Sequence, residues 1–493
     1  MKIKRVMIAA PRSGSGKTTI TCALLGALKN AGYRVSAYKC GPDYIDSMFH
    51  EKVIGIPAKN LDTFFTNAET TRELFLDSAR ESDFAVLEGV MGLYDGLGGV
   101  REEGSAYHLA QVTKTPILLV VDAKGMGRSL IPLIAGFLDY DREHLIQGVL
   151  LNRISGGFYE TIKPQIEEAL RIRVVGFLPE KEEYHIGSRH LGLMMPHELQ
   201  DMRQKLQTVS DTFAASVSLD SIMELAENAE EIETDEKAAS EEALRYAGRH
   251  SGIRSNAVEI EKSEKIAKTD SGVIIAVAKD EAFCFYYADN IRLLESYGAE
   301  IKYFSPLRDE KLPDGCHALL LGGGYPELYA GQLSGNEKMR HAVKWAVDNG
   351  MPVVAECGGF MYLHAALTDK EGVRHDMAGV IPAVCFDAGK KVRFGYVEIQ
   401  EKQPHFLPAG DKIKGHEFHY YDSTDNGGDA VAVKPVTKKT YPCIMAEENH
   451  FMGFPHLYYP SNPAFAEAFV EKARKYKEKI TQPKSVKESR ESE

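Results

Sequence analysis

The sequence predicts an α/β protein with two doubly wound, mostly parallel sheets, one in each part of the chain. The chain has 493 residues, more than one ordinary hydrophobic core organises, so two or more domains are expected. In both parts, short apolar segments alternate with longer helical segments, an order that is typical of parallel sheets. The apolar segments are rich in β-branched residues, as strands covered on both faces are.

The predicted strands fall into two groups along the chain. Those of the first group are RVMIAA (5–10), RVSAYK (34–39), FAVLEG (84–89), PILLVVD (116–122), GVLLNR (148–153) and VVGFLP (174–179). Those of the second group are GVIIAVAK (272–279), EIKYFSP (300–306), ALLLGGG (318–324) and MPVVAEC (351–357), followed by a β-rich region through VRFGYVEIQ (392–400) and CIMAEENH (443–450).

A charged stretch that is poor in large apolar residues separates the two groups. We therefore predict a first domain over residues 1–229, a solvated linker over 230–272 and a second domain over 273–475. The last residues, 476–493, predict a disordered tail.

Composition excludes several classes of function. The formal net charge of −12 argues against non-specific nucleic-acid binding, because that role needs a basic face. The seven cysteines show no C-x-x-C pair, so a disulfide framework is not expected and a reducing cytoplasm fits better. No segment is long and apolar enough for a signal peptide or a membrane span. We expect a cytoplasmic monomer or homodimer without nucleic-acid or membrane partners.

A glycine-rich turn joins the first predicted strand to an amphipathic helix. Its backbone amides can turn toward an anion, and the helix N-terminus completes a phosphate cradle. Lys17 can reach the β- and γ-phosphates of a nucleotide, and Thr18 can ligate Mg²⁺. Pro11 replaces the usual first glycine, but the strand–turn–helix context still predicts an ATP site. The predicted ATP-binding residues of this turn are Gly14, Ser15, Gly16, Lys17 and Thr18.

Four acids follow the next two predicted strands of the first group. Ligands bind in open α/β sheets at the carboxyl ends of the strands, where these carboxylates would repel one another without a cation. Because Mg²⁺ takes one or two carboxylates plus phosphate oxygens, we predict that Asp46 and Glu88 hold it together with Thr18. Asp43 and Asp95 are then available to orient a substrate or accept a proton. The alternative is capping, above all for Asp95.

Two later strands of the same group end in polar residues. Asp122 either contacts the waters around the metal or caps the following helix. The amide of Asn152 is predicted to contact the adenine edge of the nucleotide.

A second site is predicted where an apolar strand meets Cys357, two glycines and a helix. The tight turn, the small neighbours and the helix end are the features of a nucleophile elbow, and the helix end favours the reactive thiolate. A buried structural cysteine is the alternative. It does not account for the two glycines that directly follow the cysteine.

The remaining parts of this second site come from other segments. The amides of Gly323 and Gly324, at the end of another predicted strand, are predicted to form an oxyanion hole. The candidates for the general base are His416, His419 and His456. We favour His456, which follows a strand and turn near the end of the domain. Tyr458 stands where a third, carboxylate member is usual, so the site is a Cys-His dyad or a triad completed by Glu417.

Together these motifs resemble the cobyrinic acid a,c-diamide synthase family. The segments that carry the resemblance are APRSGSGKTT, KCGPDYID, EGVMGLYDG, SRHLGL, LGGGYPE, ECGGFMYL, GHEFHYY and the late His456. The resemblance implies a P-loop NTPase-like ATPase domain of the dethiobiotin-synthetase type, fused to a class I glutamine amidotransferase-like domain that lacks the triad carboxylate. It also implies Mg²⁺-dependent use of ATP and glutamine to amidate the a and c carboxylates of cobyrinic acid. Cys357 would be the nucleophile.

The same resemblance singles out Arg189 and His190, in SRHLGL, as binders of substrate carboxylates. Further cations near the predicted sheet edge that could receive an anionic tetrapyrrole are Arg12, Lys39, Arg128 and Arg153. Relatives that amidate hydrogenobyrinic acid or nickel sirohydrochlorin are not separated from this function by the sequence. A partitioning-type ATPase switch and a plain glutaminase are the alternatives of other classes.

Overall fold

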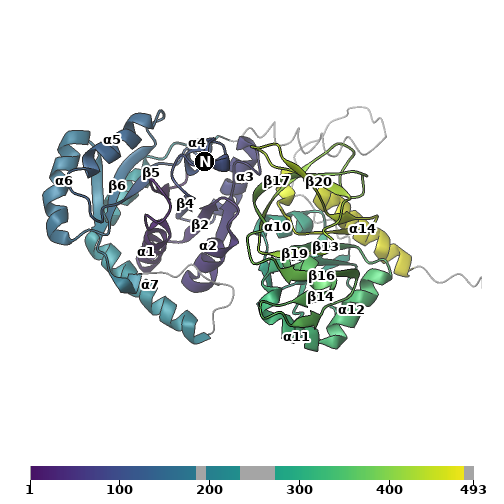
Figure 1. Ribbon diagram of the computed structural model, residues 1–493. Coiled ribbons are helices and arrows are strands. Elements are labelled where there is room, and N and C mark those ends of the chain that lie inside the picture. Colours follow the sequence, from purple (N-terminus) through teal and green to yellow (C-terminus); the bar gives the residue numbers. More distant parts are fainter. Residues whose placement is uncertain (1, 185–195, 234–271, 482–493) are drawn as a thin grey trace, which may run out of the picture. The chain divides into compact units, whose positions relative to one another are not determined.

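The computed structural model describes residues 2–184, 196–233 and 272–481. The chain divides into two compact units, residues 1–249 and 250–493, which are described separately (Figure 1). Within the described residues, no helix has the length and apolar character that crossing a membrane requires.

The first unit is built on a parallel sheet with the strand order β3-β2-β4-β1-β5-β6-β7. Its strands are β1 (Arg5–Ala9), β2 (Val35–Cys40), β3 (Ala58–Leu61), β4 (Phe84–Glu88), β5 (Ile117–Asp122), β6 (Ile146–Asn152) and β7 (Arg173–Leu178). The predicted strands of the first group are all present. β3 was not predicted, because AKNL is short and carries two polar residues.

Helices cover both faces of this sheet, as a doubly wound fold requires. Alternate residues of β1 show the two layers: Val6 and Ile8 pack with one set of helices, and Met7 and Ala9 with the other. The first set is α1 (Lys17–Asn30), α7 (Pro196–Ser216) and α8 (Leu219–Glu227). The second set is α3 (Ala68–Ala79), α4 (Ala106–Val112), α5 (Leu130–Tyr140) and α6 (Gly156–Leu170).

The second unit contains a sheet of the order β10-β8-β11-β13-β23-β22, in which only β22 runs antiparallel to its neighbour. Its strands are β8 (Val273–Ala278), β10 (Ala299–Phe304), β11 (Ala318–Leu321), β13 (Val353–Glu356), β22 (Met445–Ala446) and β23 (His450–Gly453). One face packs against α10 (Ala288–Ser296) and α14 (Ala464–Thr481). The other packs against α11 (Ala330–Gly335), α12 (Glu337–Asp348) and α13 (Gly358–Leu363).

Smaller sheets surround this parallel sheet. An antiparallel sheet has the order β21-β20-β17-β18-β24, with β17 (Arg393–Glu401), β18 (Ile413–His419), β20 (Ala430–Val433), β21 (Thr440–Cys443) and β24 (His456–Leu457). A four-stranded sheet joins β14 (His364–Thr368), β15 (Arg374–Asp376), β16 (Ile381–Asp387) and β19 (Tyr421–Ser423). A short pair joins β9 (Phe283–Phe285) to β12 (Gly323–Gly324). The two predicted parallel sheets are confirmed. Strands β17 to β21 lie in the region predicted only as β-rich, whereas β9, β14, β15, β16 and β24 were not predicted.

Two segments extend beyond the predicted domain limits. Ile232 is 1% exposed and belongs to the core of the first unit, so the first residues of the predicted linker pack against that unit. Helix α14 continues to Thr481, past the predicted end of the second domain at residue 475. The rest of the predicted linker and tail lies outside the described residues.

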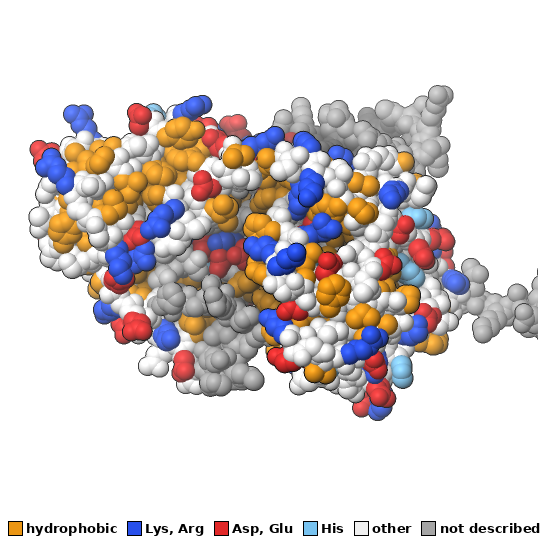
Figure 2. All heavy atoms as spheres, viewed as in Figure 1, with side chains coloured by type: hydrophobic (Ala, Val, Ile, Leu, Met, Phe, Trp, Pro, Cys, Tyr) orange, Lys and Arg blue, Asp and Glu red, His pale blue; other side chains and the backbone are white. Residues whose placement is uncertain are grey.

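On the surface shown in Figure 2, Lys and Arg side chains stand among Asp and Glu side chains on each unit. The net charge of −12 therefore does not describe every part of the surface.

Candidate active sites

The glycine-rich turn lies between β1 and α1, and Gly16 forms the N-terminal boundary of α1. Gly14 and Gly16 have φ angles of +76° and +93°, a region that favours glycine. A Cβ atom on Gly16 would lie 2.2 Å from Nδ2 of Asn152, so a side chain there must displace Asn152. The turn therefore has the backbone and the open helix end of the predicted phosphate cradle.

Lys17 points back over this turn. Its Nζ donates hydrogen bonds to the carbonyl oxygens of Arg12, at 3.3 Å, and of Met91. Burial, aided by the nearby Lys39 ammonium, lowers the pKa of Lys17 to about 8. An anion in the cradle would favour the charged form of this lysine.

A buried charge cluster lies directly behind the turn. Glu88, at the end of β4, is fully buried and accepts a hydrogen bond from Thr18 Oγ1 at 2.6 Å. Lys39 Nζ lies 2.9 Å from Glu88 Oε1 and 2.5 Å from Asp46 Oδ2. His50 Nε2 lies 3.3 Å from Glu88 Oε2. The structure thus brings the three predicted metal ligands together, and Lys39 and His50 join them.

The ionisation of this cluster follows from its burial and its charges. Burial and the Glu88 carboxylate raise the pKa of Asp46 to about 6. Burial alone would raise the pKa of Glu88, but Lys39 and His50 outweigh it and hold that pKa well below its usual range. The side chain of Lys39 is 6% exposed, so the prediction that Lys39 receives the substrate is wrong.

The donor atoms of this cluster fit Mg²⁺. Among the described residues no group of three or more His, Cys, Asp or Glu side chains could hold a metal ion on its own. Mg²⁺ needs no such cage, because it keeps several waters and takes phosphate oxygens as ligands. One hydroxyl and two carboxylates, from Thr18, Asp46 and Glu88, supply oxygen atoms of the required kind.

The other two predicted acids cap local backbone. Asp43 precedes α2 (Tyr44–Phe49), and its Oδ1 accepts a hydrogen bond from Ile45 N at 2.8 Å. Asp95 Oδ2 accepts one from Gly92 N at 3.1 Å. A Cβ atom on Gly92 would lie 2.7 Å from the carbonyl oxygen of Pro11, so this turn packs directly on the phosphate loop. Capping fixes both carboxylates at the predicted edge of the sheet.

Asn152 and Asp122 support the loop. Asn152 Nδ2 donates a hydrogen bond to the carbonyl oxygen of Ser15 at 2.8 Å, so the amide that was predicted to contact adenine holds the phosphate loop. Asp122 forms ion pairs with Arg153 and, at 3.1 Å, with Arg12. Both arginines were predicted to receive the substrate, and each has Asp122 as an ion-pair partner.

Three other basic residues were predicted to contact substrate. Arg128 is exposed after β5. Arg189 and His190 lie outside the described residues, so their predicted role stays a prediction.

Cys357 lies between β13 and α13 with φ +47° and ψ −102°, a strained conformation for a residue with a side chain. Its backbone N donates to the carbonyl oxygen of Gly453 at 2.8 Å, which ties the turn to β23. A Cβ atom on Gly358 would lie 2.9 Å from Pro326, and one on Gly359 would lie 2.0 Å from the carbonyl oxygen of Leu321. Both glycines are therefore required by close packing, as in a nucleophile elbow.

The predicted oxyanion-hole glycines lie between the cysteine turn and His456. The backbone N of Gly324 lies 3.1 Å from the position that a Cβ atom on Gly358 would take. A Cβ atom on Gly323 would lie 2.2 Å from Cε1 of His456. The pair thus lies beside both the elbow and the histidine ring.

His456 is 2% exposed and lies on β24, next to His416 on β18. The two rings stack with their centroids 5.0 Å apart. Burial and the neighbouring histidines hold the pKa of His456 well below its usual range. The ring is therefore neutral at neutral pH, and one of its nitrogens has a lone pair that can accept a proton.

The third member predicted for this site, Glu417, has other partners. Its carboxylate accepts a hydrogen bond from Tyr441 Oη and lies 3.6 Å from Lys434 Nζ. The carboxylate that contacts His456 is instead Glu356, with 4.0 Å between its Oε2 and His456 Nδ1. Sequence reasoning missed Glu356, although it is an acid inside an apolar strand and directly precedes Cys357. Tyr458, at the usual third position, donates to Asp289 at 3.0 Å.

The thiol itself differs from the prediction. Burial, with the nearby Glu327 carboxyl, raises the pKa of Cys357 far above its ordinary value. This burial opposes the expected stabilisation of thiolate by the helix end, since Cys357 is 7% exposed and α13 is short. The cysteine needs a base, and His456 is the candidate.

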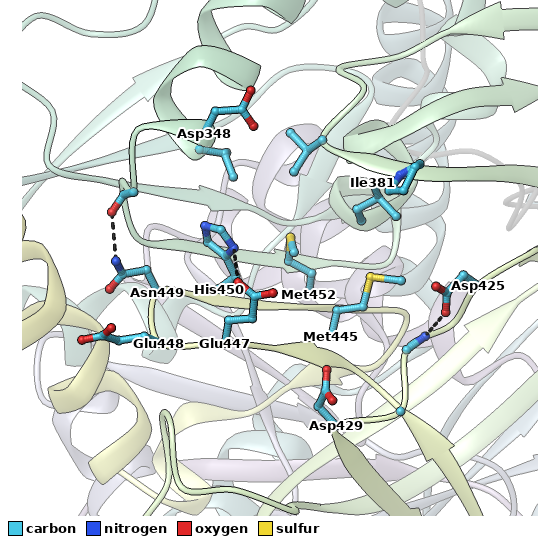
Figure 3. A pocket seen from close by; sticks show the side chains of 16 residues that line it. Asp348, Ile381, Asp425, Asp429, Met445, Glu447, Glu448, Asn449, His450 and Met452 are labelled. Carbon is cyan, nitrogen blue, oxygen red and sulfur yellow. Dashed lines mark hydrogen bonds and ion pairs between the residues drawn. The ribbon is translucent and has the colours of Figure 1, made fainter.

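A separate pocket of about 690 Å³ lies elsewhere on the second unit. Figure 3 shows Asp348, Asp429, Glu447 and His450 around it. It opens near Gly350, before β13 begins, whereas Cys357 follows the end of that strand. This acidic pocket is therefore at the opposite edge of the sheet from the cysteine and is not the glutamine site.

Comparison with known proteins fits both sites. Residues 6–193 match the model of the CobQ/CobB/MinD/ParA nucleotide binding domain, and residues 274–460 match that of the CobB/CobQ-like glutamine amidotransferase domain. The cobyrinate a,c-diamide synthase of Caldanaerobacter subterraneus subsp. tengcongensis is 37% identical over 92% of this chain and 94% of its own. The chain belongs to the cobyrinate a,c-diamide synthase family. Enzymes of that name from Listeria innocua and Salmonella typhimurium are 34% and 35% identical, over 94% and 95% of this chain and 98% of each relative.

Membership of the cobyrinate a,c-diamide synthase family confirms the predicted resemblance and the predicted order of the two folds. It also confirms the predicted class of enzyme, a nucleotide-dependent carbon–nitrogen ligase with glutamine as nitrogen donor. The domain limits and the roles of individual site residues stay predictions.

Proposed function

We propose that this protein amidates the a and c side-chain carboxylates of cobyrinic acid, using ATP and ammonia released from glutamine. The observation that carries the proposal is the pairing of two sites in one chain. One is a phosphate cradle with buried carboxylates behind it, and the other is a strained cysteine beside a glycine pair and a histidine. The relatives named cobyrinate a,c-diamide synthase support cobyrinic acid as the substrate.

The first site makes a carboxylate reactive. A carboxylate is a poor electrophile, and transfer of the γ-phosphoryl group converts it into an acyl phosphate with a good leaving group. Phosphoryl transfer depends on positioning and charge neutralisation, for which the amides near Gly16 and the ammonium of Lys17 are suited. When bound to Thr18, Asp46 and Glu88, Mg²⁺ would neutralise phosphate charge. Asp43 or Asp95 would accept the proton lost as the amide forms.

The second site supplies the nitrogen. Free ammonia is mostly protonated at neutral pH and is then not nucleophilic, so its release inside the protein is an advantage. Cys357 would attack the side-chain amide of glutamine and form a thioester, while its proton passes to His456 and then to the departing ammonia. The amides of Gly323 and Gly324 would stabilise the oxyanion.

Replacement of Cys357 tests the division of labour between the sites. We expect Cys357→Ala to lose glutamine-driven amidation and to retain amidation with added ammonium salt, because the first site needs only ammonia. Lys17→Ala should lose both reactions. Product analysis by mass spectrometry measures each. Loss of both reactions in Cys357→Ala, with normal ATP binding, would contradict two separable sites.

The same assay identifies the tetrapyrrole. Purified enzyme is supplied in turn with cobyrinic acid, hydrogenobyrinic acid and nickel sirohydrochlorin. We expect the highest kcat/KM with cobyrinic acid. A preference for either of the others would transfer the proposal to that substrate while leaving the chemistry unchanged.

A further inference from the structure

Glu356 is an acid in a place where acids are rare. It ends the apolar strand β13, is 5% exposed and precedes the nucleophile directly. Burial of a carboxyl group is unfavourable unless it has partners. Its partners include the Leu457 amide, the Tyr459 hydroxyl, which donates at 3.4 Å, and His456 Nδ1, at 4.0 Å.

Two readings of these contacts are possible, and the geometry separates them. A carboxyl group with only a structural role would need only the Leu457 amide and the Tyr459 hydroxyl, and its distance from the histidine would not matter. Here β24 places the His456 ring against Gly323 on one side, while Nδ1 lies beside Glu356. The carboxyl therefore contacts the ring of the candidate base, and Cys357 is the next residue along the chain.

We propose that Glu356 is the positioning residue of the glutaminase site and takes the place of the missing third member of the triad. The two atoms are 4.0 Å apart, and a small approach would let the ionised carboxylate accept a hydrogen bond from Nδ1–H of His456. Nε2 would then be the unprotonated nitrogen that takes the proton of the Cys357 thiol. This inference rests on the proposed function, since it needs thioester chemistry at Cys357. It replaces the earlier candidate, Glu417.

The proton balance of the step is complete within the site. As the Cys357 sulfur bonds to the glutamine carbonyl carbon, the thiol proton moves to Nε2 of His456. Collapse of the tetrahedral intermediate breaks the carbon–nitrogen bond, and the same proton leaves with ammonia. Glu356 stays ionised throughout and stabilises the transient imidazolium.

Ionisation of Glu356 sets the tautomer of the ring. A protonated Glu356 would donate to Nδ1 and force the proton of the ring onto Nε2, which could then not act as a base. Burial raises the pKa of Glu356 to about 8, although the Leu457 amide and the Tyr459 hydroxyl oppose this. The ionised fraction therefore increases as the pH rises through about 8, and glutaminase activity should increase with it.

Other titratable groups near the pair must be distinguished from Glu356. The groups that act on Glu356, His456 or Cys357 are Tyr286, Glu327, His416, Glu417, His419 and Tyr459. Burial raises the pKa of Glu327 to about 7, so Glu327→Gln is needed as a control. Burial lowers the pKa values of His416 and His456, so neither ring accounts for a rise in activity near pH 8.

The test compares Glu356→Gln, Glu356→Asp and Tyr459→Phe in the full-length enzyme. Glutamate release from glutamine is measured against pH, with ammonium-driven amidation as a check of the first site. We expect Glu356→Gln to lower kcat for glutamine by about 10- to 100-fold, the range for loss of an orienting partner, with little change in KM. The rise in activity near pH 8 should disappear, and Glu356→Asp should restore part of it.

Each control has a stated outcome. Glu327→Gln should keep the rise near pH 8. Tyr459→Phe should keep a rise but move it to higher pH, because the Tyr459 hydroxyl lowers the pKa of Glu356. Alkylation of Cys357 by iodoacetamide gives a readout without turnover, and its rate should rise through the same pH in the wild type but not in Glu356→Gln. An unchanged kcat and pH profile in Glu356→Gln would overturn the inference. So would an equal loss in Tyr459→Phe, because that result would assign Glu356 a structural role.

The failure of this inference differs from failure of the proposed function. If the wild type releases no glutamate and Cys357→Ala changes nothing, the proposed function fails. If the wild type releases glutamate and Glu356→Gln does so equally, only the role of Glu356 fails.

Discussion

Replacement of Gly16 by alanine should weaken ATP binding through two defined effects. At φ +93° an alanine is strained by about 1–2 kcal/mol relative to glycine. The new Cβ atom would also lie 2.2 Å from Asn152 Nδ2, which must then release the carbonyl oxygen of Ser15. Loss of that hydrogen bond costs a further 0.5–1.5 kcal/mol, about the usual net contribution. The loop would therefore relax out of its binding conformation.

Restoring that conformation for ATP would cost about 2–3 kcal/mol, which corresponds to a roughly 30- to 150-fold higher Kd for ATP. Isothermal titration of ATP with Mg²⁺ present measures this. Gly32→Ala is the matched control, because Gly32 has φ +88° with nothing within 4 Å of an added Cβ atom. It should lower stability to urea but leave the Kd for ATP unchanged.

A second variant separates the clash from the backbone strain. In Gly16→Ala/Asn152→Ala the clash is absent, while the strain at φ +93° and the loss of the hydrogen bond to Ser15 remain, so the Kd for ATP should stay about as high as in Gly16→Ala. ATP binding by Gly16→Ala equal to that of the wild type would refute this account of the loop. Equal losses in Gly16→Ala and Gly32→Ala would refute it as well, because they would point to general destabilisation.

The remaining predictions concern the two buried clusters. Lys39→Met should lower the free energy of unfolding of the first unit by about 3–5 kcal/mol, because it leaves Asp46 and Glu88 buried without their cation. Urea unfolding measures this, and an unchanged unfolding midpoint would contradict the role of the ion pairs. Gly359→Ala, whose Cβ would lie 2.0 Å from the carbonyl oxygen of Leu321, should abolish glutaminase activity and spare ammonium-driven amidation. Normal glutamate release would show that the turn tolerates a side chain.

Much of the fold could be predicted because buried parallel strands carry an unbroken apolar signal. The strand β3 was not predicted, because Asn60 makes the segment polar. In the structure the Asn60 amide donates to the carbonyl oxygens of Gly41 and Asp43, which no sequence pattern reveals. The pairing of the antiparallel strands could not be predicted for a different reason. Their pairing joins segments far apart in the chain, such as β18 and β24.

Site residues could be predicted where they are neighbours along the chain, because their spacing in the sequence then brings them together. The phosphate loop and the cysteine turn are local, so their glycines could be identified from neighbours in sequence. Lys39 was misread because the sequence does not show that its ammonium turns inward to Asp46 and Glu88. Glu417 could be excluded only once the structure paired His416 with His456, because strand alternation then points the next residue to the other face of β18.

A single labelling experiment follows both halves of the reaction at once. The enzyme is given ATP, cobyrinic acid labelled with ¹⁸O in its side-chain carboxylates, and glutamine labelled with ¹⁵N in its amide. We predict one ¹⁸O atom in inorganic phosphate for each amide formed, and ¹⁵N in the product even with unlabelled ammonium in the buffer. Phosphate free of ¹⁸O would contradict the acyl phosphate. A product without ¹⁵N would contradict the supply of nitrogen from glutamine through the Cys357 site.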